Sequence, residues 1–134
     1  MAKLSYIEGI GETYQAKLNA VGIKTIAALL AAGTTKKGRA ELAEKSGITE
    51  TLILKWVNHA DLMRIKGVGS EYSDLLEAAG VDTVPELSKR RPDNLTKKMI
   101  EVNAEKKLVR QVPSQKMVEK WVAQAKALPR ILEY

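Results

Sequence analysis

The residues with the clearest capacity for chemistry are two short glycine motifs of the form Gly-x-Gly. They lie in IEGIGETY, residues 7–14, and in IKGVGSEY, residues 65–72. A glycine with positive φ can end one helix, and a second glycine can lead directly into the next. The first turn of that next helix has backbone amides without intrahelical partners, and the helix dipole favours an anion there. Each motif is therefore a candidate site for one phosphate group.

The charged residues beside the two motifs differ in sign. Glu8 and Glu12 flank the first motif, whereas Arg64 and Lys66 precede the glycines of the second. We therefore expect the second motif to be the better phosphate site. Acids in a first helical turn interact with the same dipole that a phosphate would use, so Glu12 and Glu71 can instead be caps. In that case both motifs are packing corners only.

Residues suited to catalysis or metal binding are scarce. Cysteine is absent, which excludes disulfides, thiolate metal sites and a cysteine nucleophile. His59 is the only histidine, so a catalytic triad or a histidine metal site lacks a second member. We expect His59 to lie on the solvent side of its helix. The sequence thus predicts a protein that is not an enzyme and that uses no cofactor or metal.

The composition indicates which kind of secondary structure positions these motifs. At 134 residues the chain is one ordinary domain or two very small ones. Phenylalanine is absent, so the core must consist mainly of Leu, Ile, Val and Ala, which favours short packed helices over a sheet. No segment resembles a signal peptide or a bilayer-spanning helix, so we expect a soluble cytoplasmic protein.

The chain contains an internal repeat. Residues 7–29 match residues 65–87 at an offset of 58, and residues 53–60 match residues 118–125 at an offset of 65. The seven additional residues lie mostly around the segment RRPDNLTKK. We interpret the chain as two copies of one helical unit, joined without a flexible linker.

Helix boundary signals occur in both copies. Ser5 and Glu8 predict a capping box that opens the first helix. No segment alternates with the period of two that a strand requires. The predicted fold is all-α, with tandem units at residues 1–62 and 63–134 packed as one compact body. A second capping box is expected at Thr83 and Glu86, N-caps at Thr25, Thr35, Thr49, Asp93 and Ser114, and left-handed helix ends at Gly22, Gly33, Gly47 and Gly80.

The segments YIEGIGETYQAKLNAVGIKTIAALL and RIKGVGSEYSDLLEAAGVDTVPELS resemble helix-hairpin-helix units. They are similar to units in the C-terminal domain of bacterial RNA polymerase alpha subunits and in many DNA repair proteins. Nearly the whole chain, including ILKWVNHADLMRIKGVG and EVNAEKKLVRQVPS, resembles the bacterial family called domain of unknown function 4332. This resemblance implies a fold but no activity.

In DNA-binding helix-hairpin-helix proteins, the hairpin amides hold phosphates across the minor groove without reading bases. Lys or Arg usually lies beside the hairpin, and the acids beside the first motif depart from that pattern. The resemblance also permits a monovalent cation in a hairpin, although no residue here requires one. It implies amide donors at Gly9, Gly11, Thr13, Gly67, Gly69 and Glu71, with Arg64 and Lys66 on neighbouring phosphates.

A DNA glycosylase is the one enzymatic alternative that the sequence offers. Glycosylases of the helix-hairpin-helix class pair a GVG motif with a later VDT aspartate, which corresponds here to Asp82. Asp82 matches Lys24 in the first copy, which indicates an exposed turn position with no special role. The chain also has too few residues to enclose a flipped base.

Two functions remain open at this point. One is a module that binds DNA or other nucleic acid weakly and without sequence specificity, holding duplex or structured DNA by its phosphates, which the net charge of +6 and the paired motifs favour. The other is a protein-interaction or assembly module, which the acids beside the motifs favour. The sequence does not specify a protein partner or an oligomeric state. Many of the positive charges lie in four clusters along the sequence, which are Lys36, Lys37 and Arg39; Lys89, Arg90 and Arg91; Lys97 and Lys98; and Lys106, Lys107 and Arg110.

Overall fold

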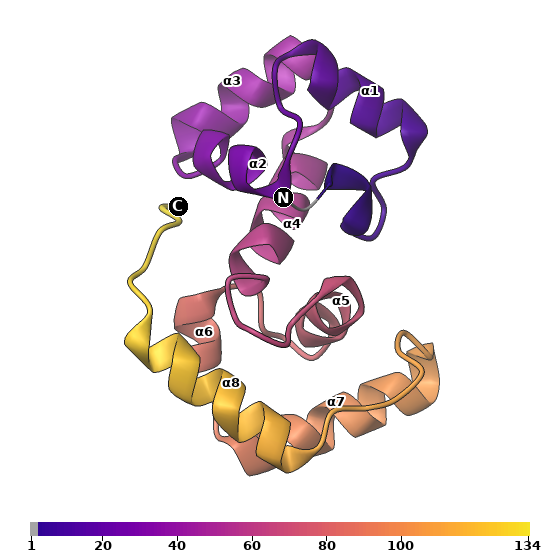
Figure 1. The fold of residues 1–134 in the computed structure, drawn as a ribbon, viewed down its shortest axis with the longest axis vertical. Coiled ribbons are helices and arrows are strands. Elements are labelled where there is room, and N and C mark those ends of the chain that lie inside the picture. The colour runs from indigo at the N-terminus through magenta and orange to yellow at the C-terminus, as the bar shows by residue number, and fades with distance from the viewer. Residues whose placement is uncertain (1–2) are drawn as a thin grey trace. The chain divides into compact units, whose positions relative to one another are not determined.

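The computed structural model describes residues 3–134, which form eight α-helices and one short 3-10 helix (Figure 1). The described part contains no strand beyond one isolated bridge between Lys3 and Thr25, so the predicted all-α fold is confirmed. None of its helices combines the length and the apolar character needed to cross a membrane. The elements are η1 (Leu4–Tyr6), α1 (Glu12–Ala20), α2 (Ile26–Ala32), α3 (Lys36–Ser46), α4 (Glu50–Leu62), α5 (Ser70–Ala78), α6 (Val84–Ser88), α7 (Pro92–Lys106) and α8 (Gln115–Ala127).

The chain divides into two compact units. Unit 1 comprises the chain up to Asp61 together with Ile131–Tyr134, and unit 2 comprises Leu62–Arg130. The last residues of the chain therefore belong to unit 1, an assignment that the two consecutive sequence copies do not anticipate. The expectation of a single compact body stays a prediction.

In unit 1, α1 packs on η1 and α3, and α2 packs on α3. Gly33, which follows α2, is buried and has a φ of −95°, so the predicted left-handed conformation is wrong there. A Cβ at Gly33 would collide with the side chain of Val57 on α4. This glycine is therefore needed for close packing and not for its backbone conformation.

In unit 2, α8 packs on α6 and α7, while α5 packs on α7. The face of α8 that contains Val118, Trp121 and Val122 is buried, as its spacing of three and four residues predicts. These side chains join a core that also includes Leu75 and Met99.

Side-chain caps begin several helices, although two of the predicted caps are wrong. Ser5 lies inside η1, so it does not cap a helix that includes Glu8. Asp93 lies inside α7, where its carboxylate accepts hydrogen bonds from the Asn94 amide at 2.8 Å and Arg91 Nη2 at 3.0 Å. Both contacts hold the pKa of Asp93 below its ordinary value. Caps are confirmed at Thr25, Thr35, Thr49 and Ser114, and left-handed glycines at Gly22, Gly47 and Gly80.

The predicted capping box at the start of α6 forms only in part. Thr83 is the N-cap residue, but its side chain makes no capping hydrogen bond. Glu86 Oε2 accepts from the amide of Asp82, one residue earlier than a capping box requires, at 3.2 Å. Asp82 is half-buried, so the expectation of an exposed turn position is also wrong.

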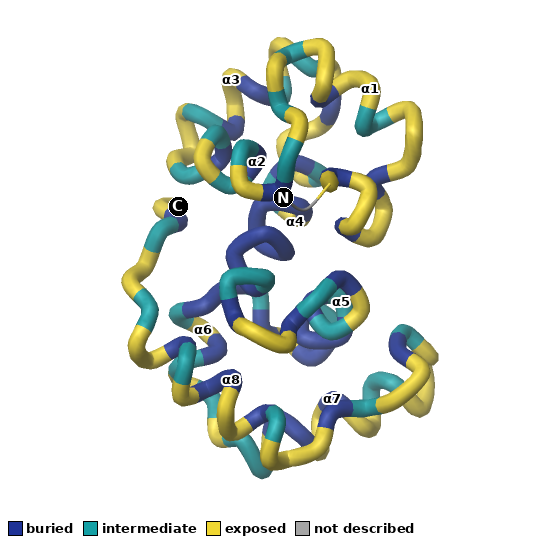
Figure 2. Tube along the Cα trace, viewed as in Figure 1, coloured by how far each residue is buried: buried dark blue, intermediate teal, exposed yellow. Residues whose placement is uncertain are grey.

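His59 is fully buried, contrary to the expectation of an exposed histidine. All residues of α4 from 56 to 62 are buried, which Figure 2 shows as a continuous dark segment. The apolar spacing of α4 predicts only one buried stripe. The prediction was wrong because this half of the helix is covered on all its faces.

Candidate functional site: two glycine turns

The first glycine turn (residues 7–14) and the second glycine turn (residues 65–72) follow the same backbone path. Gly9 has a φ of +93° and Gly67 a φ of +95°, a region that L side chains rarely adopt. The next residue in each turn, Ile10 or Val68, is buried. The positive-φ glycine followed by a buried apolar residue is therefore confirmed in both turns. Matching backbone hydrogen bonds join Ile10 N–H to Ile7 O at 3.2 Å and Val68 N–H to Ile65 O at 3.1 Å.

A tryptophan side chain lies against each positive-φ glycine. A Cβ placed on Gly9 would lie 3.4 Å from Trp56 Nε1, and a Cβ on Gly67 would lie 3.0 Å from Trp121 Nε1. Glycine is therefore required in both turns for its backbone conformation and because a side chain would approach the indole. The second requirement is stricter at Gly67, where the distance is shorter. The tryptophans also pack on tyrosines of the turns, with ring centroids 5.1 Å apart for both Tyr14–Trp56 and Tyr72–Trp121.

The second glycine of each motif is the N-cap of the following helix. Gly11 precedes α1 with φ −86° and ψ −175°, and Gly69 precedes α5 with φ −103° and ψ −161°. A Cβ at Gly11 would meet nothing within 4 Å in the described chain, so glycine is not needed at Gly11 to avoid a steric clash. Glycine instead leaves the helix start without a capping side chain, so the first amides stay available to another acceptor.

The predicted amide donors all lie within the two glycine turns. Thr13 is in the first turn of α1, and Glu71 is in the first turn of α5. Gly69 is half-buried. The exposed members of the predicted set are Gly9, Gly11, Thr13, Gly67 and Glu71.

Acidic side chains surround the first glycine turn. Glu8 and Glu12 are both exposed and lie on either side of Gly9, and Glu12 is the first residue of α1. A carboxylate in this position interacts favourably with the helix dipole and repels an approaching phosphate. The first turn is therefore electrostatically unsuited to an anion.

Basic side chains flank the second glycine turn. Lys66 is exposed immediately before Gly67. Arg64 is half-buried, and its Nη2 donates to the carbonyl of Pro129 at 2.6 Å. Part of the Arg64 guanidinium is thus used within unit 2, which leaves Lys66 as the more exposed of the two predicted cations.

Gln124 on α8 holds the second glycine turn, a role that the sequence analysis missed. Its Oε1 accepts from the amide of Lys66 at 2.9 Å, and its Nε2 donates to the carbonyl of Lys66 at 3.2 Å. At the offset of 65 the matching residue of the first copy is His59, so the repeat gave no signal for this pair. The exposed Lys120 lies one helical turn before Gln124, on the same side of α8. We call Arg64, Lys66 and Lys120 the second-turn basic group.

No match was found among curated proteins or among solved structures. The model of one protein family, described as a domain of unknown function (DUF4332), matches residues 8–128. The match includes the second glycine turn, all of the first glycine turn except Ile7, both tryptophans and Gln124. It extends over most of the chain, which therefore belongs to the DUF4332 family.

Proposed function

We propose that this protein is a non-enzymatic helix-hairpin-helix protein that binds duplex DNA weakly and without sequence specificity. The second glycine turn is the contact surface. The observation that supports the proposal is the combination of a helix start without a capping side chain and a basic group around the same turn. Helix-start amides and ammonium groups both bind phosphate oxygens, and phosphate contacts carry no sequence information.

The amides and the basic side chains at the second turn have separate roles in this proposal. The amides of Gly67, Gly69 and Glu71 hold one phosphate, while the second-turn basic group of Arg64, Lys66 and Lys120 contacts the neighbouring phosphates. The carboxylate of Glu71 is exposed in the same first helical turn. Because it opposes the anion, it keeps the affinity low.

The first turn has a secondary role. Gly9, Gly11 and Thr13 present the same amides as the second turn, but Glu8 and Glu12 repel the DNA backbone. We therefore assign most of the binding free energy to the second turn.

Fluorescence anisotropy with a random-sequence duplex at low salt tests this proposal. We expect a dissociation constant on the order of micromolar or weaker and a steep loss of affinity as salt rises. Replacing both Lys66 and Lys120 with Ala should weaken binding and lower the salt slope by about one unit per lost phosphate contact. The matched control is Lys45→Ala with Lys24→Ala, which removes the same charge from exposed positions of unit 1. Absence of binding at tens of micromolar protein would end the proposal.

A protein-interaction or assembly module is the second candidate. The bond from Arg64 to the Pro129 carbonyl favours it, because a guanidinium used inside unit 2 stabilises the fold without any ligand. The acids of the first turn favour it as well. This candidate predicts no anisotropy change with any duplex, whereas the DNA proposal predicts saturable binding.

A further inference from the structure

The segment Ile131–Tyr134 packs on unit 1 as an extended peptide would pack on a receptor. Leu132 is 1% exposed, although the residues around it are half-buried or exposed. Its burial removes a full leucine side chain from water, which stabilises the contact through the hydrophobic effect. Leu132 is therefore the apolar anchor of this segment.

The backbone of Glu133 is hydrogen-bonded on both sides. Its amide donates to the carbonyl of Thr34 at 2.8 Å, and its carbonyl accepts from Arg39 Nη2 at 2.8 Å. Its side chain is exposed. Main-chain contacts of this kind recognise an extended conformation and leave the residue type at this position open.

Tyr134 is held by its ring and by its hydroxyl. The ring lies 5.4 Å from Cζ of Arg39, within the range of a cation–π contact, and the hydroxyl donates to Asn58 Oδ1 at 2.7 Å. A tyrosine at this position is therefore preferred over an aliphatic residue.

The receptor side of this contact is formed by polar side chains that are themselves buried. Arg39 is 5% exposed and Asn58 is 7% exposed. Arg39 Nη1 donates to the carbonyl of Gly33 at 2.8 Å, which fixes the guanidinium in place before its Nη2 meets Glu133. Buried polar groups are costly unless they are hydrogen-bonded, and the segment supplies partners to both side chains. We call Thr34, Arg39 and Asn58 the segment site.

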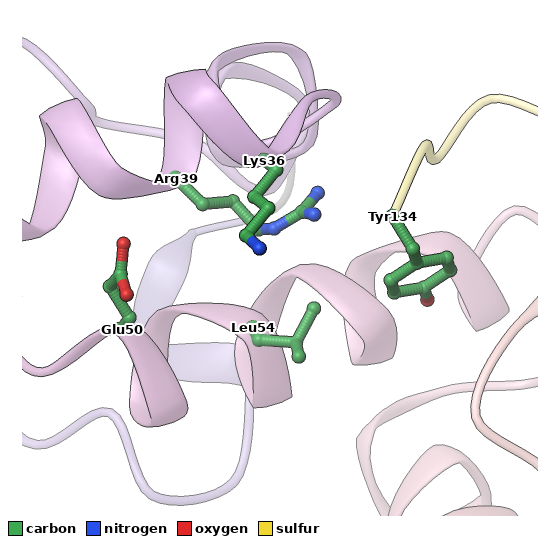
Figure 3. A pocket seen from close by; sticks show the side chains of 5 residues that line it. All are labelled: Lys36, Arg39, Glu50, Leu54 and Tyr134. Carbon is green, nitrogen blue, oxygen red and sulfur yellow. The ribbon is translucent and has the colours of Figure 1, made fainter.

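A cavity of about 260 Å³ lies beside the segment site. Lys36 and Arg39 of α3 point from one side toward Glu50 and Leu54 of α4, with the ring of Tyr134 at the far end (Figure 3). Tyr134 remains 59% exposed. The ring therefore has open space beside it, through which it can leave and be replaced.

We propose that the segment site recognises an extended Leu-x-Tyr peptide and exchanges its own segment for residues 131–134 of a second copy of this chain. The same contacts form in either case, so exchange changes no interaction energy and is opposed only by the effective concentration of the tethered segment. The connection into the segment is short and non-helical, with Leu128 extended at φ −88° and ψ 140° and Pro129 next to it. A short connection of this kind favours exchange between copies.

Binding of a labelled peptide tests the site in the full chain. The probe is a fluorescein-labelled peptide of residues 129–134, PRILEY, titrated with wild-type protein and with the Leu132→Ala variant. The variant weakens the tethered competitor, so it should bind the peptide about tenfold more tightly than the wild type does. Tyr134→Ala changes an exposed residue and serves as the second variant, with an expected gain of about threefold. Equal or weaker peptide binding by both variants would overturn the proposal.

Changes in the peptide separate recognition from non-specific adhesion without altering the protein. Against the Leu132→Ala protein, a peptide with Ala in place of Leu132 should bind at least about tenfold more weakly, and one with Phe in place of Tyr134 about twofold more weakly. A Glu133→Gln peptide is the matched control and should bind unchanged, because only the backbone of that residue is used. Equal affinity of all these peptides would contradict the site.

The second copy is tested by the mass of the full chain in solution. Light scattering should show an average mass that rises toward a dimer as wild-type protein reaches millimolar concentration. Leu132→Ala should stay monomeric over the same range, because its segment no longer anchors in the partner. A wild-type protein that is monomeric throughout, or an equal dimer in the variant, would overturn the exchange. Duplex DNA is absent from these measurements, so their outcome is independent of the proposed DNA binding.

Discussion

The first and second glycine turns share their backbone conformation and differ in their surface charge and in the side chains that hold them. Gly9 and Gly67 differ in φ by only a few degrees, and each lies against a tryptophan. Glu8 occupies the position that Lys66 has in the second turn. The backbone of Lys66 is additionally held by Gln124, where the first copy has His59.

This comparison separates what a turn needs to fold from what it needs to bind. Folding requires the positive-φ glycine, the buried apolar residue after it and the tryptophan, and both turns have all of these. Binding an anion depends on the exposed charges, which the fold does not constrain. The same backbone scaffold can therefore include one acidic turn and one basic turn, which differ in the exposed charge that they present to an anion.

The largest expected effect is on stability, from alanine at the two positive-φ glycines. Gly67→Ala and Gly9→Ala should each lower the free energy of unfolding by about 1–3 kcal/mol, because both force a Cβ into a disfavoured backbone region. Gly67→Ala should cost more, since its Cβ would lie 3.0 Å from the indole nitrogen, against 3.4 Å at Gly9. Urea unfolding measures the difference.

Gly11→Ala is the matched control for these two variants. Gly11 has negative φ and open space around a Cβ, so its replacement should cost well under about 1 kcal/mol. A Gly11→Ala variant as unstable as Gly67→Ala would show that the two glycines of a motif do not have the separate roles described above.

A smaller effect is expected from Gln124, which distinguishes the second turn from the first. Gln124→Ala removes both hydrogen bonds to Lys66 and should lower the free energy of unfolding by about 1 kcal/mol, since the site is partly solvated. Hydrogen exchange of the Lys66 amide should also become faster. Gln115→Ala, at the exposed start of α8, is the control and should change neither quantity. Unchanged exchange at Lys66 in Gln124→Ala would mean that the turn holds its shape unaided.

The smallest expected effect is on DNA affinity, from exchanging the charge of the first turn. Glu8→Lys gives the first turn the cation that Lys66 provides in the second, so duplex affinity at low salt should rise about threefold to tenfold. Glu41→Lys makes the same charge change on the exposed side of α3 and should give a smaller rise. Equal gains from the two variants would show that only net charge matters and that the turn is not a binding surface.

Local signals in the sequence were enough to predict the helical fold and the shape of both turns. Threonine caps, left-handed glycines and the apolar spacing of α8 all depend on residues within a few positions of each other. The same local signals failed for His59, because one apolar stripe does not reveal that other sides of a helix are also covered. They failed at Asp93 because Pro92, which suits the first position of a helix, begins α7, so that Arg91 is the N-cap residue and Asp93 lies inside the helix.

The sequence by itself determined the helical character of the chain, the positive φ of Gly9 and Gly67 and the charges beside each turn, because these depend on backbone preferences and residue types that are local. Only the tertiary structure decided which distant groups meet. Gln124 reaches Lys66 across 58 positions, and Arg39 reaches Glu133 across 94. No local preference encodes either pair. Each contact forms only when helix packing brings a buried or half-buried side chain to a backbone group that has no partner within a helix.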